Sequence, residues 1–220
     1  MPVKNIVITT SLVFMLFFNS SAIAAKSKGV DGEFVKVDLP QKNLNLSKSK
    51  FGDCWDLAVQ IKDNFYITTC NNNKIDTKNN YGARLLLVKI VKGKPVIKYR
   101  SHGYMDGYGI TPTFFRNQAN EIIVWADTGA EYSWGATAYL FNGVKIKELG
   151  DVRATYVKDP DHGQEESIAP YAWIYRNNGQ IIIRFTKDPL YEKNGKYMTV
   201  PAEKVKYIYN GKKLREVISK

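Results

Sequence analysis

Side chains that hold transition metals or act as nucleophiles are scarce in this sequence, which contains two cysteines and two histidines among 220 residues. A zinc site requires several such ligands, and His102 and His162 together with the cysteines are too few. No Gly-x-Ser-x-Gly nucleophile elbow is present. We therefore assign no catalytic residue, no metal ligand and no cofactor.

The sequence also lacks an apolar run long enough to cross a bilayer. Its main uncharged apolar run, Ile6 to Phe18, has 13 residues, whereas a membrane-spanning helix needs roughly 20. Lys4 precedes this run and the small residues Ser20 to Ala25 follow it. This layout is typical of a secretory signal peptide. We expect cleavage after Ala24, no transmembrane or lipid anchor, and a periplasmic or secreted protein.

Acidic residues are fewer than basic ones, 21 against 32, and the formal net charge is +11. A basic surface favours an anionic partner, either a protein or an envelope glycan. The lysines and arginines are scattered, and no block of five to eight basic residues indicates a nucleic-acid site. A second interpretation is that lysine protects the sheet edges of a small soluble β protein.

The two cysteines are expected to pair, because export places them in an oxidising compartment. Residues 54–61 and 65–70 both alternate apolar and polar side chains, which is the pattern of half-buried strands. A turn at 62–64 would fold these runs into a hairpin with Cys54 nearly opposite Cys70. Such a short disulfide loop would stabilise the fold by about 3 kcal/mol.

Helical periodicity is almost absent beyond the signal peptide, and strand-like runs recur with turn signals between them. They form three groups of four: 54–61, 65–69, 84–91 and 96–99; 113–115, 121–126, 136–141 and 144–149; 171–175, 180–185, 204–209 and 214–218. The second strands of the groups begin at 65, 122 and 181, a nearly constant period. We predict three four-stranded antiparallel repeats.

The last turn of each group has a glycine. Asn142-Gly143 and Asn210-Gly211 indicate type I′ hairpins, in which both central residues have positive φ. Lys92-Gly93 occupies the matching place in the first group. These turns predict that the third and fourth strands of every repeat pair directly.

The repeat phrases resemble those of integrin-α-type propeller repeats, the FG-GAP and VCBS class. Phe51-Gly52-Asp53-Cys54-Trp55-Asp56-Leu57-Ala58-Val59 is similar to the opening strand of that family, and residues 116–124 are similar to its loop-to-strand phrase. The resemblance implies a β-propeller of four-stranded blades in the bacterial envelope. Closed propellers have four to eight blades, so three repeats predict an open or degenerate propeller, with a β-sandwich as the alternative.

The domain organisation follows from this reading. Residues 1–24 are the signal peptide, residues 25–50 an N-terminal extension with one strand within 32–38, and residues 51–220 a single all-β repeat domain. Three open repeats would leave two sheet edges, so a homodimer formed by edge pairing stays an alternative.

Two segments are candidate calcium sites. The family commonly binds calcium in an acidic loop, and the matching loop at 116–120 has no carboxylate before Glu121, which implies that calcium is lost there. Residues 158–166 contain Asp159, Asp161, Glu165 and Glu166. We interpret that cluster as a solvated turn rather than a cation site.

Aromatic residues in glycine-flanked loops are the main candidates for binding, because rings with polar handles suit recognition. One loop contains Tyr104, Asp106 and Tyr108, and the other contains Asp127, Glu131, Tyr132 and Trp134. Trp125, which lies within an apolar strand, is expected in the core. The alternative interpretation is that the loop tyrosines are incidental and have no role in binding.

The predicted function is that of an exported, non-catalytic binding protein that recognises a protein partner, such as an inhibitor or immunity protein. One alternative is an envelope glycan-binding protein or glycan-active enzyme, for which Asp127 and Glu131 are the nearest carboxylate pair. Another is a structural envelope protein that binds anionic polymers through its basic surface.

Overall fold

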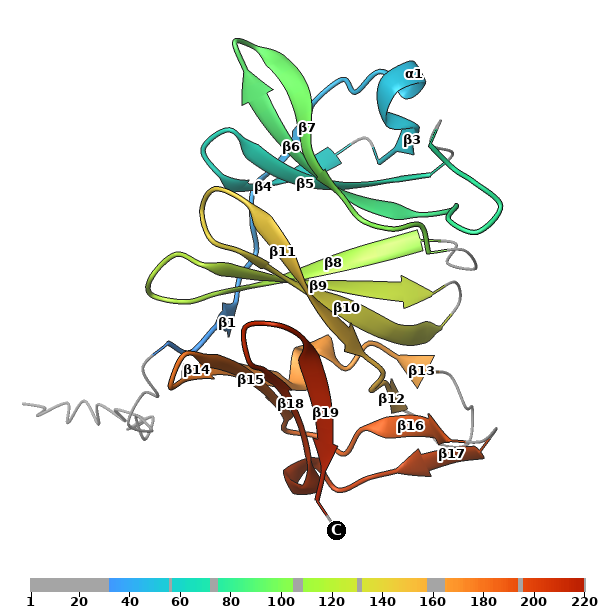
Figure 1. The fold of residues 1–220 in the computed structure, drawn as a ribbon, viewed down its shortest axis with the longest axis vertical. Coiled ribbons are helices and arrows are strands. Elements are labelled where there is room, and N and C mark those ends of the chain that lie inside the picture. The colour runs from blue at the N-terminus through green and yellow to red at the C-terminus, as the bar shows by residue number, and fades with distance from the viewer. Residues whose placement is uncertain are drawn as a thin grey trace, which may run out of the picture.

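The computed structural model describes residues 32–55, 57–71, 75–104, 109–129, 132–157, 165–193 and 196–219. Over these residues the fold is all-β, as predicted, and three antiparallel sheets are stacked in an open row (Figure 1). Within each four-stranded repeat the paired strands follow one another in sequence, except where a hairpin interrupts the third repeat. The described strands do not close into a barrel.

All twelve predicted strands are found. The first sheet contains β4 (Leu57–Lys62), β5 (Phe65–Asn71), β6 (Arg84–Val91) and β7 (Lys94–Arg100). The second contains β8 (Gly109–Arg116), β9 (Ile122–Gly129), β10 (Ser133–Phe141) and β11 (Ile146–Val152). The third contains β14 (Ala172–Asn177), β15 (Gln180–Phe185), β18 (Val205–Tyr209) and β19 (Leu214–Ile218).

Several short elements were not predicted. The run 54–61 is divided into β3 (Asp53–Cys54), which pairs only with β5, and β4, which lies between β5 and β2 (Gln41–Asn43). The other additions are α1 (Lys48–Phe51), β12 (Tyr156–Val157), β13 (Glu165–Glu166) and the short 3-10 helices η1 (Ala169–Tyr171) and η2 (Ala202–Lys204). A hairpin of β16 (Leu190–Lys193) and β17 (Lys196–Thr199) lies between β15 and β18.

The predicted conformation of two hairpin turns was wrong. The strands at Asn142-Gly143 and Asn210-Gly211 do pair, but neither asparagine has a positive φ. Each side chain instead accepts hydrogen bonds from backbone N–H groups two and three residues later, which closes a longer loop. Positive φ at both central residues occurs at Lys92-Gly93 and at Asn178-Gly179.

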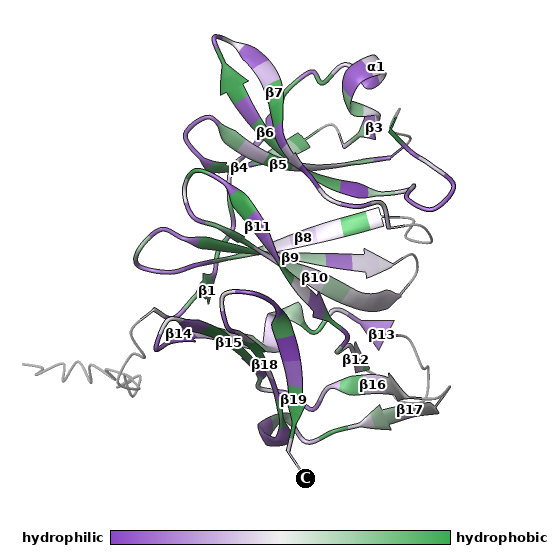
Figure 2. Cartoon of the chain, in the orientation of Figure 1, coloured by the Kyte–Doolittle hydropathy of each residue, from purple (hydrophilic) through white to green (hydrophobic). Residues whose placement is uncertain are grey.

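Strand alternation sends successive residues of the middle sheet into two different cores. Ile122 and Val124 face the first sheet, and Ile123 and Trp125 face the third. The predicted core position of Trp125 is confirmed, because its side chain is fully buried. The edge strand β19 instead carries both hydrophobic and hydrophilic residues (Figure 2).

The N-terminal extension is part of the stack, and we call residues 34–43 the N-terminal strap. Phe34 bridges to Ile174 in β14, and β1 (Val35–Lys36) pairs with β8. Further along, β2 pairs with β4. The strap therefore follows the first strand of all three sheets, from the third to the first (Figure 1).

The second and third sheets are also joined by an ion pair. The carboxylate of Glu121 accepts hydrogen bonds from Arg176 Nη2 at 2.8 Å and from its Nε at 3.2 Å. The amide of Asn117 donates to the same carboxylate. Glu121, which follows the loop compared with a family calcium site, is thus engaged by an arginine of the next repeat.

The predicted disulfide is confirmed. Cys54 and Cys70 are direct partners in the β3–β5 register and are joined by a disulfide bond. Both cysteine side chains lie on the outer face of the first sheet, where Phe51 of α1 packs with Leu86 and Val88. This end of the stack is therefore closed by the chain itself.

A buried arginine, Arg84, anchors the segment between β5 and β6. The side chain of Arg84 is 1% exposed, and its guanidinium donates to Asp76, to Asn80 and to the carbonyl of Ser101. Asn80 in turn accepts from the N–H of Gly103. Removal of the guanidinium would take a donor from the buried carbonyl of Ser101 and would break the contacts that tie Asp76 and Asn80 to β6.

We expect Arg84→Leu to lower the free energy of unfolding by about 3–5 kcal/mol, since one member of a buried charged network is lost. The matched control is Lys94→Leu on an exposed position of β7, which should change stability by less than about 0.5 kcal/mol. Urea denaturation followed by fluorescence measures both values. Equal stability of the two variants would contradict this role of Arg84.

Candidate functional site

A groove of about 910 Å³ lies at one corner of the third sheet. One wall is the β16–β17 hairpin with the segment that follows it, which contributes Tyr197 and Lys204. The opposite wall is formed by Trp134 of β10 and Arg153 after β11. The edge strand β19 contributes Glu216, so five separate parts of the chain meet here when Glu165 of β13 is included.

The rim of the groove is aromatic and exposed. Trp134 is 40% exposed and Tyr132 is 46% exposed, and their rings make an edge contact with centroids 6.2 Å apart. Across the groove lie Tyr197, which is 59% exposed, and the exposed side chains of Met198 and Ile218. Large apolar side chains that stay exposed around one hollow are typical of a binding surface.

The floor of the groove is a fixed hydrogen-bond network. The hydroxyl of Tyr207 donates to Glu216 Oε1 at 3.2 Å and accepts from the backbone N–H of Arg153. The hydroxyl of Tyr191 lies 3.3 Å from that of Tyr207 and donates to it, because the proton of Tyr207 is already used. Burial raises the pKa of both tyrosines, so both stay protonated at neutral pH.

A second carboxylate is held on the side of the hairpin. Thr155 Oγ1 donates to Glu165 Oε2 at 3.1 Å. The backbone of Thr155 exchanges two hydrogen bonds with Leu190, the first residue of β16. The hairpin is therefore tied to the segment after β11 that carries Arg153, and the width of the groove is set by backbone pairing.

Asp127 lies behind the aromatic rim rather than in the groove. Its carboxylate is buried and accepts hydrogen bonds from Ser167 at 2.6 Å and from Ser133 at 3.5 Å. Burial raises the pKa of Asp127 to about 6, against the opposing effect of the nearby Ser167, Trp125 and Ser133 groups. Because Ser133 precedes Trp134, this carboxyl helps to fix the start of β10.

The predicted binding residues separate in the structure. Trp134 lines the groove, Tyr132 contacts its ring and Asp127 is buried behind them, whereas Tyr104 lies between the first and second sheets and its hydroxyl is 2.6 Å from that of Tyr139. The remaining three predicted residues, Asp106, Tyr108 and Glu131, lie outside the described residues. Most of the acidic cluster at 158–166 also lies outside them.

Sequence reasoning missed the hairpin wall and the floor, including Arg153, Tyr191 and Glu216. One signal was available, since 18 residues separate the predicted strands 180–185 and 204–209. Loops of that length without structure of their own are uncommon in a domain. Residues 186–203 were therefore the place to expect an additional element.

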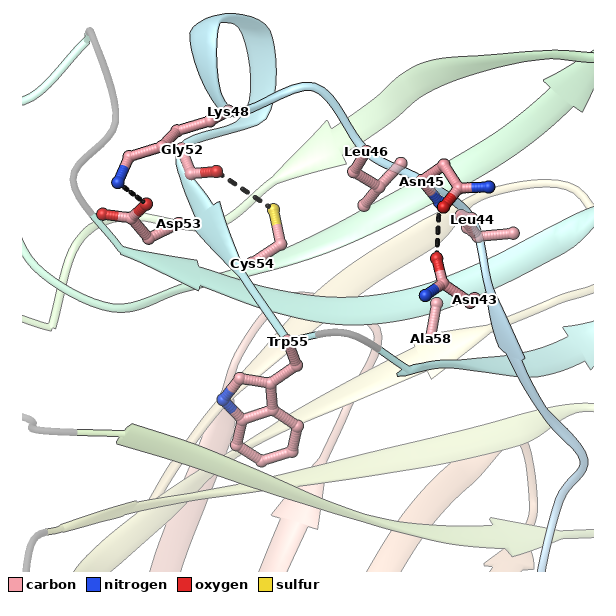
Figure 3. Close-up of a pocket in the computed structure, with 10 residues that line it drawn as sticks. All are labelled: Asn43, Leu44, Asn45, Leu46, Lys48, Gly52, Asp53, Cys54, Trp55 and Ala58. Carbon is pink, nitrogen blue, oxygen red and sulfur yellow. Dashed lines mark hydrogen bonds and ion pairs between the residues drawn. The ribbon is translucent and has the colours of Figure 1, made fainter.

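Two further hollows lie beside the first sheet. One, of about 330 Å³, is formed near the disulfide between α1 and the loop before it (Figure 3). Trp55 at its margin points away from Leu44 and Leu46, toward a second hollow of about 640 Å³ beside β8. Both are smaller than the groove.

The described part of the chain contains no group of three or more histidine, cysteine, aspartate or glutamate side chains that could hold a metal ion. Over the same residues, no helix is long and apolar enough to cross a membrane.

The raised pKa of Asp127 predicts a pH-dependent contribution to stability. Between its ordinary value of 3.8 and about 6 the folded chain binds more protons at this site than the unfolded chain, so stability decreases as the pH rises through this window. Relative to Asp127→Asn, the wild-type free energy of unfolding should fall by about 2 kcal/mol between pH 4 and pH 7. A difference between the two proteins that is independent of pH, measured by denaturant unfolding, would contradict this.

In comparisons with known proteins, no family model, no curated protein and no solved structure matches the chain.

Proposed function

We propose that this chain is an exported, non-catalytic binding protein that holds a segment of a protein partner in the groove between Trp134 and the β16–β17 hairpin. The observation that carries the proposal is the set of large apolar side chains exposed around one hollow. Interface hot spots are enriched in tryptophan, tyrosine and arginine. All three residue types line this groove.

The charges of the groove suit a polypeptide. Glu165 and Glu216 are held as acceptors by Thr155 and Tyr207, and Arg153 and Lys204 offer donors nearby. A peptide segment presents both N–H donors and carbonyl acceptors, whereas an anionic polymer presents acceptors alone. The mixed lining therefore favours a protein partner over a polyanion at this site.

The shape of the groove is also held by hydrogen bonds within the chain itself. Its walls are joined by the Thr155–Leu190 backbone pairing, and its floor is joined by the Tyr191–Tyr207–Glu216 network. A preorganised site loses less conformational entropy on binding. This rigidity supports stoichiometric recognition of the inhibitor or immunity type.

Export to the periplasm or the exterior is part of the proposal. The Cys54–Cys70 disulfide supports it, because such bonds persist mainly in oxidising compartments. The sequence resemblance to propeller repeats of the bacterial envelope is compatible with it and stays a prediction. The three successive four-stranded meanders support that resemblance at the level of architecture alone.

One alternative has an observation of its own. Aromatic faces beside paired carboxylates are also what a sugar ring requires, and Trp134 and Tyr197 flank Glu165 and Glu216. This arrangement would suit an envelope glycan. The two readings differ in what the groove retains at high salt and in whether a protein or a carbohydrate is recovered.

The test is capture from native envelope and culture supernatant by the immobilised, oxidised protein, at low salt and at about 1 M salt. We expect one protein partner that survives high salt. Trp134→Ala and Tyr132→Ala should each weaken its binding by at least about tenfold, since hot-spot truncations cost more than about 1.4 kcal/mol. Trp55→Ala removes a similarly exposed tryptophan from the first sheet and should leave binding unchanged.

Other outcomes would overturn the proposal. Recovery of glycan alone, with loss on Trp134→Ala, would replace the protein partner with an envelope carbohydrate. A partner whose affinity is the same for the wild type, Trp134→Ala and Tyr132→Ala would show that the groove is not the binding site. Capture that disappears entirely at high salt would favour binding of anionic polymers.

A further inference from the structure

The outer face of the third sheet lies at the end of the stack opposite α1, and no other sheet covers it (Figure 1). Its inner face is defined by core residues such as Ile183 and Tyr207, so alternation places the neighbouring residues on the outer face. Those residues form two rows across four strands. One row is Tyr175, Ile182, Ile208 and Arg215, and the other is Trp173, Arg184, Lys206 and Val217.

Every charged side chain that these four strands place on the outer face is a cation. They are Arg184, Lys206 and Arg215, and none forms an ion pair with a described acidic residue. The register of Ile183 with Tyr207 puts Arg184 opposite Lys206. Like charges directly opposite one another destabilise a sheet, so this pair needs an anion beside it to become favourable.

The face also has apolar residues, which lie beside the cations in the two rows. Trp173 is 38% exposed and stacks on Tyr175 with ring centroids 4.6 Å apart. Its indole N–H donates to Glu33 at the margin of the sheet. Ile208 and Val217 are half-exposed. An exposed tryptophan beside arginines is the composition of an interface centre.

The two ends of the stack differ. At the first sheet the outward-facing Leu86 and Val88 are fully buried, because α1 and the leucines before it pack over them. At the third sheet the chain supplies no such element among its described residues. A terminal sheet with an uncovered, partly apolar face is expected to be covered by a partner.

We propose that the outer face of the third sheet docks an acidic surface of a partner protein, separately from the groove. Charge complementarity selects this occupant, because a face whose only strand-borne charges are Arg184, Lys206 and Arg215 attracts carboxylates. The exposed Trp173 distinguishes a protein surface from a polyanion, which gains little from burying a tryptophan.

Two occupants from this chain fit less well. In a symmetric dimer the face would meet itself, and its cations would oppose cations. The residues that lead into the sheet, Ala25 to Asp31, contain Lys26 and Lys28 against one aspartate. Both occupants would add positive charge to a face that already carries three cations.

The experiment is a selection of random 12-residue displayed peptides on the immobilised, oxidised protein at about 0.15 M salt. Enriched peptides should combine aspartate and glutamate with apolar residues. The variant R184E/K206E/R215E should weaken their binding by at least tenfold. The control K42E/K94E/K145E, which makes the same charge change on exposed lysines of the other two sheets, should weaken it by less than threefold.

Further variants keep the test independent of folding and of the groove. R184Q/K206Q/R215Q removes the cations without adding acids, and it should still weaken binding by at least threefold if the reversed variant fails to fold. Trp173→Ala should weaken binding as well. Trp134→Ala should leave peptide binding at this face unchanged, even where it abolishes capture of the partner proposed for the groove.

The proposal is overturned if the enriched peptides are not acidic, or if the reversed and control variants behave alike. Binding of phosphatidylglycerol vesicles or of a 20-nucleotide single-stranded DNA that only R184E/K206E/R215E abolishes, without enrichment of acidic peptides, would make the face a polyanion site. Self-association seen by sedimentation and lost in that variant would assign it to a second copy.

Discussion

The hydrogen bonds of the N-terminal strap are the constraint on which the arrangement of the three sheets depends. Each sheet is a meander whose own ladders end at its first strand, and an open row of such sheets exposes those edges. The strap pairs with β14 through Phe34, with β8 through Val35 and Lys36, and with β4 through residues 41–43. One segment thus satisfies the first edges of all three repeats and spans both of the cores between them.

The positions of the groove and of the outer face of the third sheet follow from this arrangement. The stack has two ends, and the chain covers one of them with α1, beside the disulfide. At the other end the third repeat departs from the first two by inserting the β16–β17 hairpin. The groove lies beside that insertion, and the uncovered cationic face lies on the other side of the same sheet. The third repeat therefore carries both candidate recognition surfaces, while the first two give it a rigid support.

Much of the fold could be predicted from the sequence, because strand-like apolar runs and the turn signals between them are local. They locate β6, β15 and β19 at their observed bounds. The strap escapes such reasoning, since Gln41-Lys42-Asn43 is a short, exposed and polar strand that only its partner defines. The prediction for the turn at Asn142 was also wrong, because the asparagine side chain accepts hydrogen bonds from two N–H groups of the loop and removes the need for positive φ. The groove could be predicted only on the side of Tyr132 and Trp134, since its other residues converge from distant parts of the chain.

The most direct measurement of the central claim is native-state hydrogen exchange of the strap. The backbone N–H groups of Phe34 and Val37 donate to Ile174 and Phe114, and that of Gln60 donates to Pro40. If the strap holds the sheets together, these amides exchange only when the whole domain unfolds, with the same free energy as Val124 in the core of β9. Exchange of Phe34 and Val37 through a local opening, several kcal/mol easier than that of Val124, would show that the stack stands without the strap and would contradict the account.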